Sequence, residues 1–415
     1  MTQAAAASWD DVWLLDGVRT PFVDYNGAFA PVSPIDLGIK VARAVLDRAV
    51  VPAGDVGLVV AGSVAPAGFD TYVLPRHIGL FAGVPVETPA LLVQRVCGTG
   101  IEAIVQAADA VALGRAELGL CVGAESMSRN PIAAFTHRGG FPLGRVEFKD
   151  FLWEALRDPA PDMTMGDTAE RLAQRHAITR DDADRFAARS FARALAARDS
   201  GFLAGEIVEI ASETFARDGF RPRAIALPRG TATVATDSHV RPSPPEVLAK
   251  LRPAFGGVQT AGNSSAVVDG AAAALVAAGA YARRLTRRPL ARLRAAAAIG
   301  VPPDVMGIGP VPAIRAVLAR TGLALTDVAR IEINEAFAAQ VIACARELGL
   351  DEARLNVNGG AIAIGHPLAA TGVRLAVTLA RELARAGERY GIASACIGGG
   401  QGIALLIENA APAGA

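Results

Sequence analysis

Cysteine is scarce in this chain of 415 residues, and the spacing of the few cysteines excludes two kinds of site. Cys97, Cys121, Cys344 and Cys396 are widely scattered and form no CxxC pair. This spacing indicates neither a disulfide framework nor a zinc-binding cysteine cluster, so we expect no metal. A reducing, intracellular setting fits such cysteines better, and we expect a cytoplasmic protein.

An excess of either charge is also absent, because 41 lysines and arginines balance 41 aspartates and glutamates. No basic surplus is left to attract a phosphate backbone or an anionic membrane, so we expect neither nucleic acid nor membrane as a partner. The start, MTQAAAASWDD, lacks the basic segment of a secretory signal and the arginines of a transit peptide. The most apolar run, GAAAALVAAGA over residues 270–280, is too short to span a bilayer, and we expect a buried core helix there.

What the chain does have is hydrophobic residues, 52% of the total, which is enough for a large core and more than one domain. Strand-like runs such as VWLLDGV, VGLVVAGSV and ELGLCVGAES alternate with helical patterns such as DLGIKVARAVLDRAV. This alternation favours α/β layers around a sheet that is covered on both faces.

The middle of the chain differs in composition from the two ends. From about residue 130 to 253 it becomes richer in arginine, aspartate, proline and short polar helices, and the α/β alternation then returns in a similar order of elements. We therefore expect two similar halves and an insertion. Their bounds would be 1–128, completed by 251–283, for the N-terminal half, 129–250 for the inserted loop domain, and 284–415 for the C-terminal half.

Cys97 lies in LLVQRVCGTGIEAI, between an apolar run and a helical pattern. A cysteine at a strand-to-helix turn is close to the helix dipole and to unpaired N–H groups, which favour the thiolate over the thiol. Gly98 and Gly100 would let other groups approach closely, and a carbonyl attacked by the sulfur would find backbone donors nearby. The stretch predicts a nucleophile; the alternative is a small buried cysteine in a tight turn.

His366 and Cys396 also lie in glycine-rich surroundings. Gly365 and Pro367 flank His366, as a positioned base or oxyanion donor would need, although a lone histidine is usually structural. Cys396 precedes the glycines of SACIGGGQG, whose successive N–H groups could bind an anion. The alternative for Cys396 is a hairpin turn with an incidental thiol.

Asn334, in EINEAFAAQ, lies between a hydrophobic strand pattern and an alanine-rich helical pattern. It could be the N-cap of that helix, or its amide could hold a water molecule or orient the histidine. Spacing leaves both interpretations open.

Several motifs follow one another along nearly the whole chain. They are RTPFVDYNGAFA near the start, CGTG at Cys97, GAESMS (123–128), MGDTAE (165–170), LRPAF (251–255), TAGNSSAVVDGAAA from Thr260, NEAF from Asn334, GGAIAIGHP from Gly359 and CIGGGQG from Cys396. In this order they resemble the thiolase family, the CoA-dependent C-acyltransferases that cleave or form 3-ketoacyl-CoA.

The resemblance implies a role for each matching residue. Cys97 would take the acyl group, and His366 would activate it and donate at one oxyanion site, where Asn334 would hold a water molecule. Cys396 would move the proton at the α-carbon of acetyl-CoA. The backbone N–H groups of Cys97 and Gly398 would form a second oxyanion site, and the kinetics would be ping-pong. Two donor sites suit a reaction that develops both enolate and tetrahedral alkoxide charge.

The resemblance also implies the fold and the partners. The fold would be a five-layered αβαβα arrangement of two similar halves, with the inserted loop domain over the active site. Ser265 matches the serine that contacts the pantetheine arm of CoA, and Met165 and Phe255 match residues that shape the acyl pocket. CoA and acyl-CoA would be substrates, no cofactor would be permanently bound, and the protein would be a homodimer or homotetramer.

The chain departs from the family pattern near these residues. Thr164 stands where short-chain biosynthetic thiolases often carry histidine, and Ala369 and Thr371 replace glycine and serine after His366. Gln401, in GGGQG, makes this motif more similar to that of degradative or aromatic-pathway thiolases. Two alternatives are a related condensing ketoacyl synthase, against which Cys396 argues, and a non-catalytic CoA- or lipid-binding protein, which would have lost its catalytic groups.

Overall fold

The computed structural model describes residues 4–134 and 139–411, and its framework is a single hydrogen-bonded sheet. Ten strands of the described residues pair in the order β16-β17-β18-β15-β1-β14-β5-β3-β4, with β2 beside β14. Their bounds are β16 Val328–Ile333, β17 Tyr390–Ile397, β18 Gln401–Asn409, β15 Ala291–Gly300, β1 Ala5–Arg19, β14 Val268–Ala278, β5 Leu118–Glu125, β3 Leu58–Gly62, β4 Ala90–Leu92 and β2 Val23–Asp24.

The long strand β1 joins two groups of strands. Its first part pairs antiparallel with β15, its last part pairs antiparallel with β14, and Val12 to Leu14 pair with both. The β14 side continues into parallel β5, β3 and β4, whereas the β15 side continues through β18 to β17 and β16. The sheet therefore has two halves, as the repeated order of elements indicates.

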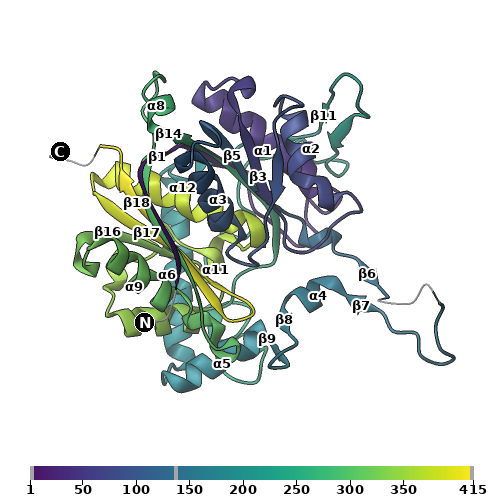
Figure 1. The fold of residues 1–415 in the computed structure, drawn as a ribbon. Coiled ribbons are helices and arrows are strands. Elements are labelled where there is room, and N and C mark those ends of the chain that lie inside the picture. Colours follow the sequence, from purple (N-terminus) through teal and green to yellow (C-terminus); the bar gives the residue numbers. More distant parts are fainter. Residues whose placement is uncertain (1–3, 135–138, 412–415) are drawn as a thin grey trace.

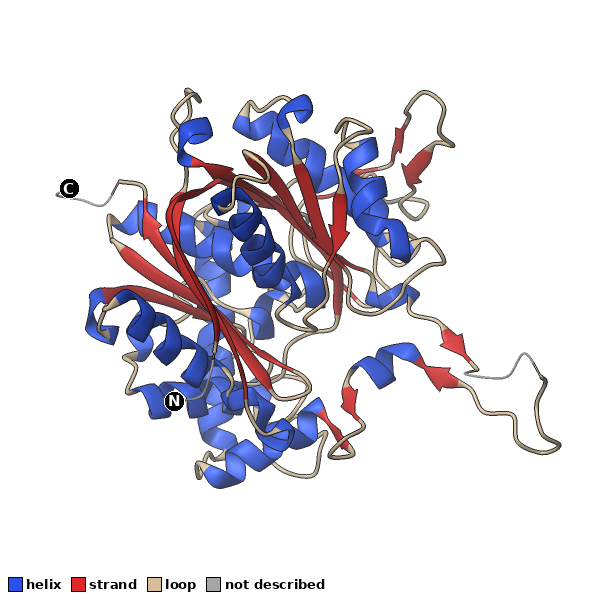
Figure 2. Cartoon of the chain, viewed as in Figure 1, coloured by secondary structure: helices blue, strands red, loops and turns tan. Residues whose placement is uncertain are grey.

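Helices cover both halves and fill the space between them (Figure 1). The helices are α1 Pro34–Ala49, α2 Leu74–Phe81, α3 Thr99–Ala112, α4 Phe151–Ala155, α5 Met165–Arg175, α6 Arg180–Asp199, α7 Pro245–Leu248, α8 Gly279–Ala282, α9 Pro310–Thr321, α10 Ala338–Leu348, α11 Ala361–Ile364 and α12 Leu368–Ala386. Helices α3 and α12 contact strands of both halves and each other, α1 packs on β14 and β5, and α9 packs on β15 and β18. The result is the expected αβαβα order, which Figure 2 shows as blue and red layers.

The alanine-rich run at residues 270–280 is a strand, so the expected core helix was wrong. Residues 270–278 belong to β14, which pairs with β1 on one edge and β5 on the other and is almost wholly buried, and the last two residues of the run begin the short helix α8. Alanine favours helices in isolation, but pairing on both edges overrides that propensity. Burial on both faces also removes the polar alternation that normally marks a strand.

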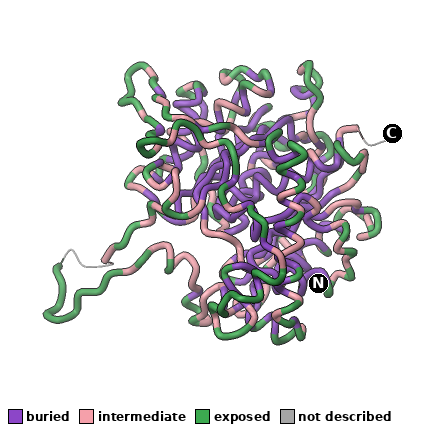
Figure 3. The backbone as a smooth tube through the Cα atoms, turned by 180° about the vertical axis from the view of Figure 1, so that it is seen from behind, coloured by how far each residue is buried: buried purple, intermediate pink, exposed green. Residues whose placement is uncertain are grey.

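Short elements fill the segment between Asn130 and Lys250. They are β6 Ile132–Ala133, β7 Lys149–Asp150, β8 Arg157–Asp158, β9 Met163–Thr164, β10 Ile210–Ala211, β11 Glu213–Phe215, β12 Arg223–Ile225 and β13 Thr233–Val234, together with α4 to α7. The β6–β7 arm extends away from the body and is mostly exposed in Figure 3, whereas α5 and α6 pack against α10. No helix of the described residues is long and apolar enough to cross a membrane.

A buried cation ties this segment to the sheet. Arg19, at the end of β1, is 1% exposed and donates to Glu206 at 2.7 Å and to Asp237 at 2.6 and 2.9 Å. These carboxylates raise the pKa of Arg19 even though burial opposes its charge. Both carboxylates come from the inserted segment, so the ion network holds that segment on the N-terminal half.

Arg19→Met should destabilise the fold strongly, because it leaves the buried Asp237 without its cation and leaves Glu206 with only Arg381. We expect the free energy of unfolding to fall by about 3–5 kcal/mol in urea titrations. The control is Arg283→Met, which breaks an exposed pair with Asp11 at 3.1 Å and should cost less than about 1 kcal/mol. Equal losses in the two variants would contradict the structural role of the network.

Candidate active site

Cys97 lies in a tight turn two residues before α3. Val96 has a positive φ of 42°, and the N–H of Gly98 donates to the carbonyl of Arg95 at 2.8 Å. A Cβ on Gly98 would lie 2.6 Å from Ile397, and one on Gly100 would lie 2.5 Å from the backbone of Val373. The two glycines therefore let the β17–β18 hairpin and α12 approach the nucleophile turn, as the sequence indicates.

Burial dominates the electrostatics of the Cys97 thiol. Only 8% of the residue is exposed, and desolvation raises the pKa of Cys97 to about 11. The backbone N–H groups of Gly398 and of Cys97 itself bond to the sulfur and lower the pKa, while the nearby Glu125 raises it. The expectation of a thiolate at neutral pH was wrong for this structure, because the loss of solvation outweighs the helix dipole. A base must therefore remove the proton.

His366 is a neutral base held at both ring nitrogens. Nδ1 lies 2.6 Å from Oγ1 of Thr371, which itself donates to the carbonyl of Pro367 at 3.1 Å. The Thr371 hydroxyl hydrogen is thus used, so Nδ1 must carry the proton and Nε2 must be the acceptor. Nε2 lies 3.2 Å from Nδ2 of Asn334. Burial, and then the charge of Arg374, lower the pKa of His366 to about 3.

Asn334 is the partner of His366 and does not cap a helix. Helix α10 begins at Ala338 with Phe337 as its N-cap, so the capping interpretation was wrong. The backbone N–H of Asn334 donates to Ser394 on β17 at 2.9 Å, which fixes the residue beside the hairpin. Its Oδ1 is buried and has no partner among the described residues. One acceptor therefore remains for a water molecule or a substrate.

Cys396 is fully buried near the end of β17. It lies in the β17–β18 hairpin, so the hairpin in the alternative interpretation of this cysteine is present. The hairpin turn uses Gly399 and Gly400 at positive φ, and the N–H of Gly398 points to the sulfur of Cys97. Burial, and then the proximity of Cys97, raise the pKa of Cys396 well above its usual range. The structure thus brings Cys97 and Cys396 together. Cys344, in α10, also raises the pKa of Cys396, whereas Cys121 lies in β5.

A mainly apolar cavity of about 240 Å³ opens beside His366. Its lining includes Met165, Phe255 and Ser265, three residues identified from the sequence, and the sulfur of Met165 would be 3.2 Å from a Cβ on Gly398. The other lining residues are Met127, Trp153, Leu156, Thr164, Gly166, Ser264, Ala266, Val267, Phe337 and Leu368. Sequence reasoning missed Trp153 and Leu156 because they lie in and just after the five-residue helix α4, which is too short to show periodicity.

The three departures from the family pattern have structural explanations. The hydroxyl of Thr164 caps α5 by bonding to Asp167. Ala369 is not among the residues that line the cavity, its backbone carbonyl lies against Gly100 and Gly123, and Thr371 keeps a hydroxyl on the histidine. The added bulk at positions 369 and 371 therefore lies in the packing behind His366.

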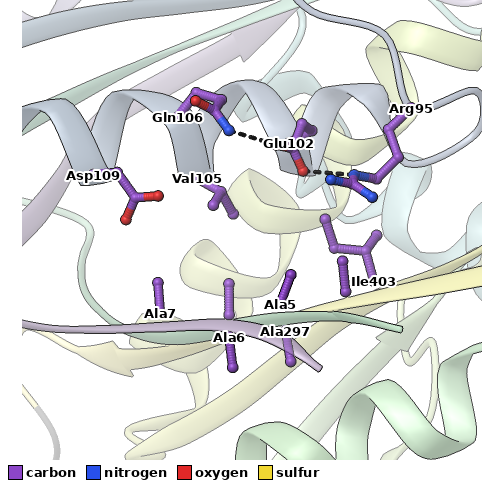
Figure 4. A pocket seen from close by; sticks show the side chains of 12 residues that line it. Ala5, Ala6, Ala7, Arg95, Glu102, Val105, Gln106, Asp109, Ala297 and Ile403 are labelled. Atoms are coloured by element: carbon purple, nitrogen blue, oxygen red, sulfur yellow. Dashed lines mark hydrogen bonds and ion pairs between the residues drawn. The ribbon is translucent and has the colours of Figure 1, made fainter. Parts of the chain in front are cut away.

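A second cavity, of about 300 Å³, lies on the other side of α3 (Figure 4). Alanines of β1 and β15 form one wall, and Arg95, Glu102 and Gln106 form the other. Arg95 bonds to Glu102 at 2.7 Å and to Gln401 at 3.0 Å, so its charge is already satisfied. Arg95 thus links the turn that carries Cys97 to Gln401 on β18, and Gln401 is not among the residues that line the first cavity.

The αβαβα fold contains a cysteine surrounded by N–H donors, a neutral histidine and an apolar cavity. Together these features define an acyltransferase.

Comparison with known proteins identifies the family. The family model for the thiolase N-terminal domain matches residues 12–280, and that for the thiolase C-terminal domain matches residues 287–409. The mitochondrial 3-ketoacyl-CoA thiolase of Bos taurus is 42% identical over 404 residues, covering 96% of this chain and 98% of that protein. The acetyl-CoA acetyltransferase of Pseudomonas aeruginosa is 40% identical over 402 residues, covering 96% and 99%.

A solved structure supports the same family assignment. The crystal structure of human mitochondrial 3-ketoacyl-CoA thiolase in complex with CoA matches with a TM-score of 0.90 and 40% identity, covering 96% of this chain and 98% of that one. The chain therefore belongs to the thiolase family, and it is an acyltransferase that acts on CoA esters. The synthase and non-catalytic alternatives are set aside on this evidence.

The lowered pKa of His366 should make stability depend on pH. The histidine titrates near 6.5 when unfolded and near 3 when folded, so only the unfolded state gains a proton as the pH falls through 6.5. We expect this residue to cost about 1 kcal/mol of unfolding free energy between about pH 7.5 and about pH 5.5. Urea unfolding of wild type and His366→Asn at both pH values tests this. An equal pH dependence in the two proteins would show that His366 is not held neutral.

Proposed function

We propose that this thiolase transfers an acyl group between 3-ketoacyl-CoA and CoA through an acyl-enzyme on Cys97. The observation that carries the proposal is the convergence of two backbone N–H groups, those of Cys97 and Gly398, on one buried thiol. Such a pair of donors is what a tetrahedral alkoxide on the attacked carbonyl needs. These donors and the thiol come from the two halves of the chain.

In the acylation step, His366 is the base for Cys97. Its Nε2 is unprotonated because the ring is neutral, so it can accept the thiol proton as the sulfur attacks the keto carbonyl. Its low pKa opposes this transfer, and the N–H donors that stabilise the alkoxide must offset that cost. A sulfur–carbon bond forms, and the bond between the keto carbon and the α-carbon then breaks. The products are an acyl thioester on Cys97 and the enolate of acetyl-CoA.

The enolate requires a second donor site and a proton. We propose that its oxygen is held by His366 and by a water molecule on Asn334, whose buried Oδ1 is free to accept. Cys396 gives its thiol proton to the enolate carbon and becomes a thiolate. That thiolate then takes the proton of the incoming CoA thiol, and the CoA sulfur displaces Cys97 from the acyl group. Cys97 leaves as a thiolate and takes back the proton held by His366.

The cavity suits the remainder of the substrate. We propose that Ser265 contacts the pantetheine arm of CoA and that Met165 and Phe255 shape the acyl pocket, because all three line the same cavity as His366. CoA as the ligand is supported by the related human structure that contains it. Nearly all the lining side chains are apolar, which favours a hydrocarbon acyl group over a charged one.

We also propose a division of the chain into two halves and an insertion. The N-terminal half comprises residues 1–128 and 251–283, and the C-terminal half comprises residues 284–415. The insertion, residues 129–250, covers the CoA site. Trp153 and Met165 support the last point, because they bring the insertion into the cavity.

A homo-oligomer is supported by the free edge of β4, where Leu91 and Leu92 are exposed. A cytoplasmic location fits four cysteines that are all free.

The proposal predicts a specific pattern of lost activity. We expect wild type to cleave members of a 3-ketoacyl-CoA series in the presence of CoA, and Cys97→Ala and Cys396→Ala each to lose at least about 1,000-fold in kcat. Cys121→Ala, at a buried cysteine outside the site, is the control and should keep most of the activity. A fully active Cys97→Ala variant would refute the proposal.

The Thr371 contact predicts a second pattern. Thr371→Val keeps the side-chain shape but removes the acceptor for Nδ1, so the preferred tautomer of His366 is lost, whereas Thr371→Ser keeps it. We expect kcat to fall by about 10- to 100-fold in the valine variant and by less than about threefold in the serine variant. Steady-state kinetics measure both, and similar losses in the two would indicate a packing effect instead.

A further inference from the structure

Glu125 is a fully buried carboxylate beside the site that the proposed chemistry does not use. It is the last residue of β5, has no exposed surface, and is not among the residues that line the substrate cavity. Its charge nevertheless raises the pKa of Cys97, which places it close to the nucleophile. A buried charge at such a position needs an explanation, because removing a carboxylate from water is costly.

The surroundings of Glu125 supply only hydrogen-bond donors. Oε1 accepts from the hydroxyl of Ser63 at 3.1 Å, from the N–H of Val64 at 3.2 Å and from the N–H of Ala65 at 3.2 Å. Oε2 accepts from the N–H of Val64 at 3.0 Å and from that of Ala369 at 3.0 Å. Because both oxygens serve as acceptors, the ionised carboxylate is the form that this arrangement fits. Burial raises the pKa of Glu125 to about 7 against these donors, so the carboxylate is ionised above that pH.

These bonds reach the two segments that flank the reacting groups. Ala369 is the second residue of α12 and follows His366 by three positions, and Pro367 at the N-cap offers no side-chain acceptor. Glu125 therefore provides the acceptor that the start of the helix lacks. On the other side, Val64 packs against the cluster formed by Cys97, Met127 and Leu368.

We propose that Glu125 is a positioning residue for acyl transfer, which holds the base-bearing start of α12 and the 63–65 segment against the nucleophile turn. The inference rests on the proposed function of Cys97 and His366. Glu125 touches no substrate. It acts by fixing where His366 stands, since Pro367 and Ala369 move together at the start of the helix. Its negative charge also keeps the Cys97 thiol protonated until His366 removes the proton.

The test combines thiolysis kinetics with alkylation of Cys97. In Glu125→Gln the amide NH₂ meets backbone N–H donors, so one anchored segment must shift. We expect kcat to fall by up to about 100-fold and KM to change by less than about twofold, because a small misplacement of a catalytic group lowers the rate and leaves the cavity intact. Ser63→Ala removes one of the five bonds and should lower kcat by only a few-fold.

Alkylation by iodoacetamide, followed by peptide mass spectrometry from about pH 8 to about pH 12, reports the ionisation of Cys97. Besides Glu125, the titratable groups to consider at this thiol are Cys396, whose pKa is raised by Cys97, and His366, the proposed base, and both are the same in the two proteins. We expect the alkylation midpoint of Glu125→Gln to move to lower pH, because the opposing charge is gone. Cys97 would thus become more reactive to the reagent while turnover slows, a combination that loss of folding alone does not produce.

Glu206→Gln is the matched control, since Glu206 is an equally buried carboxylate far along the chain with Arg19, Thr378 and Arg381 as donors. It should lose stability and keep the wild-type midpoint. A folded Glu125→Gln protein with wild-type kcat and midpoint would overturn the proposal, and if that variant does not fold, wild-type values in Ser63→Ala would do so. The alkylation result stands even if wild type cleaves no 3-ketoacyl-CoA, so it separates this inference from the proposed function.

Discussion

The exclusion of water from Cys97 and His366 is the physical constraint on which the site depends. Burial raises the pKa of the thiol to about 11 and lowers that of the histidine to about 3, so both groups are neutral in the free protein. In the mechanism we propose, neither charge exists until a substrate carbonyl is present to receive the sulfur. The N–H groups at Cys97 and Gly398 then offer fixed dipoles where alkoxide charge develops, and in a dry site such dipoles need little reorganisation.

This constraint explains why the chain needs two halves. The nucleophile comes from the first half, whereas Asn334, His366 and Cys396 come from the second, and the two meet where α3 and α12 pack between the halves of the sheet. Gly98 and Gly100 permit that contact. Residues 130–250 contribute Trp153 and Met165 to the lining of the cavity, and the buried Arg19 network holds this segment against the sheet.

Much of this could be predicted from the sequence. The alternation of apolar runs and helical patterns gives the layers, and glycines beside each reactive residue mark where chains approach closely. The local sequence pattern fails to predict structure and ionisation where tertiary contacts determine them. The alanine-rich β14 is a strand because it has partners on both edges, and the Cys97 thiol is neutral because it is buried. Whether Asn334 caps a helix or contacts the histidine likewise depends on a tertiary contact, because His366 lies 32 residues away along the chain. Trp153 gave no signal, since α4 is too short for a periodic pattern.

The central claim is that Cys97 carries the acyl group, and trapping the intermediate tests it most directly. Wild type would be mixed with a 3-ketoacyl-CoA in the absence of free CoA, quenched in acid and digested for peptide mass spectrometry. The account predicts a mass increase equal to the acyl group on the peptide that contains Cys97, lost again when CoA is added before the quench. An acyl group on the Cys396 peptide instead, or no acyl adduct during active turnover, would contradict it.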